Sequence, residues 1–170
     1  MLNKKIAELL NNQVNKEFYS AYLYLDMSNY YKSKGLDGFA NWYRIQTQEE
    51  RDHAMLFIDY LHLNGQEVTL ESIGKPDKQF ANFSDPLEIG AAHERYVSDL
   101  IHNIYSEAYD AKDFRTMQFL DWFVKEQAEE EETADGMIQK FQLFGSDSKG
   151  LYMLDAEFAG RTYAPPSLVL

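Results

Sequence analysis

Prolines occur only at positions 76, 86, 165 and 166, so two long stretches of this chain lack the residue that most strongly breaks helices. A polar turn at Ser33–Asp37 divides the first stretch into two predicted helices. Gly65 stands directly after the second of them, where glycine commonly ends a helix. Asp113 is placed to cap the last long helix. The chain is therefore predicted to be all-α, with helices over about 3–32, 37–64, 85–111, 113–144 and 149–158.

The segment between the second and third helices is too long for a simple turn. Residues 66–83 contain Gly74, Pro76 and scattered polar groups, which indicates a linker. Fully extended, such a segment reaches about 60 Å, whereas each long helix measures about 40 Å. A compact domain rarely keeps a loop of this length without a reason. We expect a crossover along the whole bundle, so that the second and third helices start at the same end. Asp85-Pro86-Leu87-Glu88 is interpreted as the next helix start, with Asp85 as the cap.

The apolar stripe of each long helix is interrupted near its middle by polar groups. Steps of three and four residues place the members of a stripe on one helix face. The polar residues predicted on these inward faces include Gln13, Glu17, Gln46, Glu50, His53, Glu94, Glu130 and either Glu126 or Gln127. The step from Glu17 to His53 equals the step from Glu94 to Glu130, so the two helical hairpins repeat one design. Packed face to face, they bring these groups to one level.

Carboxylates buried without counter-charges are costly, at several kcal/mol per ion. Four glutamates at one level, without lysine or arginine beside them on the stripes, need either protons or metal cations. Oxygen ligands with one imidazole suit iron or manganese, and also zinc. Two single glutamates plus two Glu-x-x-His motifs form the di-iron bundle pattern. This chain has one such motif, Glu50–His53, and an altered second copy, Gln127–Glu130.

Three segments carry a family resemblance: Asn15–Tyr24, Gln48–His53 and Glu126–Glu131 resemble the ferroxidase segments of bacterial and archaeal non-haem ferritins. The resemblance covers about residues 1–160, including the fifth helix. It implies that residues 1–170 are one ferritin-like domain, with a bundle over about 3–144 and a tail over 160–170. It also implies a homo-oligomeric shell of 24 subunits. Such a shell oxidises Fe(II) with dioxygen or hydrogen peroxide and stores ferric oxyhydroxide mineral.

The resemblance implies two or three iron ions per subunit and assigns their ligands. Iron site A would use Glu17, Glu50 and His53. Site B would use Glu94 and Glu130, with Glu50 bridging and Gln127 close by. A third site would use Glu49, Glu126, Glu129 and Glu130. Tyr24 would hydrogen-bond near the site or donate an electron.

Neighbouring families fit less well. Bacterioferritins keep Glu-x-x-His in both halves and place a haem-ligating methionine directly after the second-helix glutamate, where this chain has Arg51. No haem is therefore expected. DNA-binding mini-ferritins place their iron ligands between subunits and lack the fifth-helix extension.

Two alternatives from other functional classes stay open. A di-iron oxidase or peroxidase of the rubrerythrin type would act without storage, but the chain has no cysteine for the accompanying electron-transfer module. A non-catalytic acidic bundle that binds a protein partner, as cytokines do, would leave the inward glutamates without a purpose.

Charge and hydropathy exclude several partners. The net charge of −12 argues against binding to a nucleic-acid backbone, and no apolar run approaches a membrane span. Residues 1–18 lack the apolar stretch of a signal peptide, so a cytoplasmic location is expected. Three histidines, His62, His93 and His102, are predicted to be surface or interface residues. Trp42 and Trp122 are predicted to be packing residues in the core or beside the site, and Glu131 and Glu132 to belong to a solvated run of charges.

Overall fold

The computed structural model describes residues 2–170. Within that range, all regular secondary structure is helical. The helices are α1 (Lys4–Ser33), α2 (Asp37–Leu63), α3 (Asp85–Asp110), α4 (Phe114–Phe144) and α5 (Ser148–Phe158). The predicted all-α class is confirmed, and the predicted helix ends agree with the observed ones within two residues. Within residues 2–170, none of the helices combines the length and the apolar character needed to cross a bilayer.

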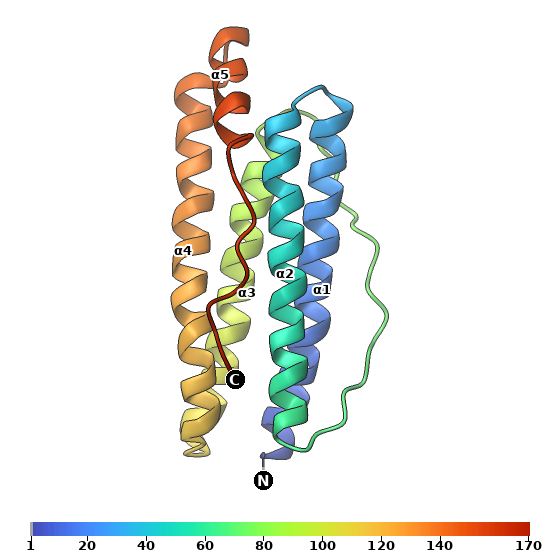
Figure 1. Ribbon diagram of the computed structural model, residues 1–170, viewed down its shortest axis with the longest axis vertical. Coiled ribbons are helices and arrows are strands. Elements are labelled where there is room, and N and C mark those ends of the chain that lie inside the picture. The colour runs from blue at the N-terminus through green and yellow to red at the C-terminus, as the bar shows by residue number, and fades with distance from the viewer. Residues whose placement is uncertain (1) are drawn as a thin grey trace.

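The four long helices form two antiparallel hairpins, α1 with α2 and α3 with α4 (Figure 1). The segment after α2 returns along the whole bundle beside α1. The second and third helices therefore start at the same end, as the length of the linker predicts. Asn11 on α1 fixes this crossover, because its side chain donates to Thr69 O at 3.0 Å and accepts from Thr69 N at 2.9 Å. The crossover is thus hydrogen-bonded to the outer face of α1.

The helix ends follow the local chemistry at most positions. Gly65 has a φ of +69°, and the N–H groups of Gly65 and Gln66 donate to carbonyls of the last turn of α2. Asp113 caps α4 by accepting from Thr116 N at 3.2 Å. The interpretation of Asp85 as a cap is wrong. Asp85 lies inside α3, and its carboxylate accepts from the backbone of Ala81 and Asn82, so it orders the turn that precedes the helix.

The core consists of two apolar clusters separated by a polar layer. One cluster contains Leu10, Phe57, Ile101 and Phe123, and the other contains Met27, Tyr31, Phe39 and Met137. The buried glutamates of all four long helices lie between them. Because the apolar clusters fix the helices on both sides, they hold this polar layer rigidly.

The short helix α5 packs on the start of α2 (Figure 1). The carboxylate of Asp155 accepts from Gly38 N at 2.8 Å and from Phe39 N at 3.0 Å, so α5 caps α2 from outside. The approach is so close that a Cβ atom on Gly38 would lie 1.6 Å from Asp155 O. Only glycine allows this contact between the two backbones.

We therefore expect Gly38→Ala to lower the stability of the protein by about 3 kcal/mol, because α5 must move away and its capping bonds are lost. Gly136→Ala on α4 is the matched control, since a Cβ there meets nothing within 4 Å. That control should be neutral or stabilising by about 0.5–1 kcal/mol. Thermal midpoints of both variants test the expectation. Equal midpoints would show that α5 does not depend on this contact.

Candidate metal centre

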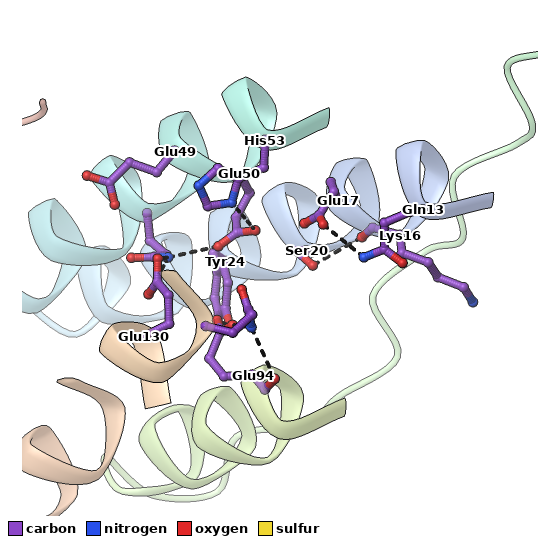
Figure 2. Close-up of polar contacts among 12 residues, drawn as sticks. Gln13, Lys16, Glu17, Ser20, Tyr24, Glu49, Glu50, His53, Glu94 and Glu130 are labelled. Carbon is purple, nitrogen blue, oxygen red and sulfur yellow. Dashed lines mark hydrogen bonds and ion pairs between the residues drawn. The ribbon is translucent and has the colours of Figure 1, made fainter. Parts of the chain in front are cut away.

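One group of potential metal ligands comes from the first hairpin. Glu17 on α1 and Glu50 and His53 on α2 are buried, and each offers a ligand atom within 4.8 Å of the other two. His53 Nδ1 lies 3.6 Å from Glu50 Oε2 (Figure 2). Gln13, one turn before Glu17, donates to Glu17 Oε1 at 2.8 Å. The three residues therefore form a compact, dry set of two carboxylates and one imidazole.

A second group comes from the other hairpin and faces the first (Figure 2). Glu94 on α3 and Glu130 on α4 are buried. The Tyr24 hydroxyl of α1 donates to Glu94, and Gln127 donates to Glu94 Oε2 at 3.2 Å. Gln46 of α2 joins the two groups, because its amide donates to Glu50 at 2.8 Å and to both oxygens of Glu130 at 2.9 and 3.0 Å. The predicted inward residues therefore do lie at one level of the bundle.

Burial determines the protonation of these carboxyl groups in the metal-free protein. It raises the pKa of Glu17 to about 8 and that of Glu130 to about 7, and the charge of Glu50 adds to both effects. Burial likewise raises the pKa of Glu94 well above its usual range. Glu17 and Glu94 are thus mainly protonated at neutral pH, and Glu130 is near the midpoint of its titration, unless a cation replaces the proton.

Glu50 and His53 behave differently because they form a pair. Burial alone would raise the pKa of Glu50, but its contact with His53 lowers it below the usual value. Burial alone would lower the pKa of His53, but Glu50 and Glu17 together raise it to about 10. The pair is therefore charged in the metal-free protein.

Glu17 Oε2 carries the clearest sign that a cation fits here. It is buried and has no hydrogen-bond partner, which is unusual for a buried polar atom. Together with Glu50 and His53 it presents oxygen and imidazole donors to one point. This donor set suits iron, manganese or zinc. A cation would satisfy the unpartnered oxygen and take the place of the protons on the buried carboxyl groups.

The predicted third-site residues occupy a separate, more open place. Glu49, Glu126 and Glu129 line a groove of about 290 Å³ between α2, α4 and the C-terminal tail, and Glu130 connects the groove to the buried layer. Burial raises the pKa values of Glu49 and Glu126. Glu129 is exposed and lies 3.5 Å from Lys125. The four carboxylates thus line one groove, Glu49 from α2 and the other three from α4.

Several residues around the centre differ from the prediction. His93 is not a free surface residue. It is half-buried, hydrogen-bonds to Ser20 Oγ at 2.8 Å, and meets the Tyr24 ring edge-on at 5.9 Å. Glu131 is partly buried and accepts from Ser98, so it is not simply part of a solvated run. Trp122 flanks the site as predicted, with its ring edge-on to His53 at 5.5 Å.

Sequence reasoning assigned no role to Gln13, Gln46 or Arg161. The two glutamines had a usable signal, because each precedes an inward glutamate by four residues and so lies on the same helix face. Arg161 had none. It belongs to the tail after α5, whose path over the bundle depends on tertiary packing alone.

Comparison with known proteins gives a consistent result. The profile of the Ferritin-like domain family matches residues 7–144. The chain is 35% identical to the bacterial non-heme ferritin of Staphylococcus epidermidis, covering 96% of this chain and 98% of that protein. It is 37% identical to the bacterial non-heme ferritin of Campylobacter jejuni, over 91% of this chain and 93% of that one.

Solved structures agree with these relatives. An open-pore ferritin from the archaeon Archaeoglobus fulgidus superposes with a TM-score of 0.93 at 41% identity, covering 95% of this chain and all of that chain. A form of the same ferritin engineered to be closed gives a TM-score of 0.94 at 40% identity, covering 96% and 100%. The likeness therefore extends over nearly the whole length of both chains.

Proposed function

This chain belongs to the ferritin family, and we propose that it is an iron-storage subunit that oxidises Fe(II) at a di-iron ferroxidase centre. The observation that carries the proposal is the buried layer of four glutamates and one histidine, in which Glu17 Oε2 has no partner. Names of the relatives support iron as the metal. The layer has no other evident purpose, because it weakens the metal-free fold.

In the proposed centre, Glu17 and His53 hold the first Fe(II) ion, and Glu94 and Glu130 hold the second. Glu50 lies between the two groups and bridges both ions. Each Fe(II) gives up one electron, so a pair reduces dioxygen to hydrogen peroxide, or hydrogen peroxide to two waters, with uptake of two protons. The carboxylates then stabilise the more highly charged Fe(III).

Three neighbouring groups complete the proposal. Gln127 orients Glu94, to which it donates. Tyr24 holds Glu94 from the other side and is positioned to supply an electron. Glu49, Glu126, Glu129 and Glu130 form the third iron site, in the groove that leads away from the buried pair.

We further propose that 24 subunits form a closed shell around the mineral, that the whole chain acts as one domain, and that the protein works in the cytoplasm. Homo-oligomerisation of this kind follows closed point-group symmetry. The names of the solved neighbours, a ferritin with an open pore and an engineered closed form, describe assemblies of a related chain.

Size-exclusion chromatography with light scattering tests the shell and storage together. A shell of 24 chains of 19.8 kDa should have a mass near half a megadalton. After aerobic addition of Fe(II) at hundreds of ions per subunit, the same particle should stay soluble and hold the iron. A monomer or dimer that binds about two ions and lets the excess precipitate would contradict storage. It would favour a di-iron oxidase of the rubrerythrin type.

A further inference from the structure

The C-terminal tail is part of the wall of the metal centre. After α5 it turns back and runs along the bundle between α4 and α2 (Figure 1). Asn41 of α2 donates to Arg161 O at 3.1 Å, and Trp122 of α4 donates to Ser167 Oγ at 3.0 Å. The tail is thus attached to both helices, and residues Ala164–Ser167 line the groove that holds the third group of carboxylates.

Arg161 is the residue of the tail that reaches furthest toward the buried layer. Its guanidinium lies over the Trp42 ring at 4.1 Å and donates to Trp42 O at 3.2 Å. It also donates to Gln46 Oε1 at 2.8 Å and forms an ion pair with Glu49. The side chains of Arg161 and Glu49 are 21% and 18% exposed, so this ion pair is largely withdrawn from water. A planar guanidinium can serve all these partners together.

The contact with Gln46 fixes which way the amide of that glutamine points. Because Arg161 holds the carbonyl oxygen, the amide nitrogen faces Glu50 and Glu130 and donates to both. A reversed amide would place its oxygen against two carboxylates. Arg161 therefore orients the group that links the two proposed iron sites.

The contact with Glu49 has a different consequence. Glu49 shares the groove with Glu126 and Glu129, and Arg161 already neutralises it there. A cation that uses Glu49 as a ligand has to compete with the guanidinium. Charge-assisted pairs of this kind are about twice as strong as neutral hydrogen bonds.

We propose that Arg161 is a positioning residue with opposite effects on the two parts of the centre: it orients Gln46 in favour of the buried pair of ions and holds Glu49 away from the third ion. This inference rests on the proposed function. It makes the tail a built-in competitor of the third cation, attached to the same subunit. A tail residue with a merely structural role would affect all the ions in the same direction.

Calorimetric titration of the metal-free full-length protein with Zn²⁺, which is not oxidised, tests the inference. In Arg161→Gln the third ion should bind about tenfold more tightly, because its competitor is gone. The first two should bind about tenfold more weakly, because Gln46 is no longer oriented. Arg161→Lys keeps the charge without the planar fork, so it should weaken the first two ions while leaving the third near the unaltered value.

A matched variant separates the mechanism from general charge effects. Arg44→Gln removes an equal charge from an exposed position of α2. It should leave all three affinities unchanged. An unchanged third-ion affinity in Arg161→Gln, or a parallel weakening of all three ions, would overturn the inference. Fewer than two ions bound by the unaltered protein would contradict the proposed function itself.

Discussion

Oxidation of Fe(II) by the Glu50→Ala variant is expected to be at least about 100-fold slower than by the unaltered protein. Glu50 is the member of the buried layer that contacts both halves of the centre. It offers a ligand atom within 4.8 Å of those of Glu17 and His53, and it shares the Gln46 amide with Glu130. Removing it takes a ligand from both proposed ions, and misplacing two reactants by about 1 Å already costs about this factor.

Stopped-flow absorbance with two Fe(II) ions per subunit measures this rate directly. Removing Glu50 leaves His53 without its buried ion-pair partner, so light scattering first checks that the variant still folds and assembles. Glu132→Ala removes an equal charge from an exposed position of α4 and should oxidise iron at the unaltered rate. A Glu50→Ala protein that assembles normally and still oxidises iron at the full rate would contradict the assignment of the centre.

The buried layer could be predicted from the sequence because its residues recur at the spacing of one helix face. Glu17, Glu50, Glu94 and Glu130 each occupy a position that an apolar residue would otherwise take, and equal spacings in the two hairpins set them at one level. The crossover could be predicted from length alone. Both inferences use properties that act along a single helix or linker.

Features that depend on contacts between distant segments could not be predicted. Nothing in the spacing of Gly38 and Asp155 indicates that α5 caps α2, and nothing around Arg161 indicates that the tail returns to Gln46. His93 was misjudged for a related reason. It lies next to the inward Glu94, off the centre of the stripe, and only the packing of α1 against α3 turns it toward Tyr24.

The metal-free protein is expected to lose stability as the pH rises from about 5 to 8, and Zn²⁺ should abolish most of that loss. Glu17 and Glu130 have pKa values of about 8 and about 7 in the folded protein, raised by burial from the ordinary value of 4.5. A raised folded pKa contributes stability that is complete below the unfolded pKa and is lost as the pH passes through the folded one. His53 acts in the same direction at higher pH, with a folded pKa of about 10 against 6.5.

The pKa of Glu50 is lowered in the folded protein, so Glu50 contributes stability that is present above pH 4.5. This contribution is lost only when the pH falls below 4.5. Between pH 5 and 6.5 the loss therefore comes from Glu17 and Glu130, and above pH 6.5 His53 adds to it. Each pKa unit between the ordinary and the folded value corresponds to about 1.4 kcal/mol, so Glu17 and Glu130 together should lose about 6 kcal/mol of stability across the window from pH 5 to 8. Zn²⁺ reverses it because the ion takes the place of the protons and binds more tightly as the pH rises.

Scanning calorimetry at fixed protein concentration, with and without Zn²⁺ at pH 5, 6, 7 and 8, measures the effect as the thermal midpoint. Glu17→Gln is the informative control, because a neutral amide at that position removes the group with the pKa of about 8. The metal-free variant should show a flatter decline than the unaltered protein and be the more stable of the two at pH 8. Equal slopes in both would mean that Glu17 is ionised without a metal, and that the layer is neutralised by some other group. A flatter slope would instead show that Glu17 is one of the carboxyl groups whose ionisation weakens the metal-free bundle as the pH rises.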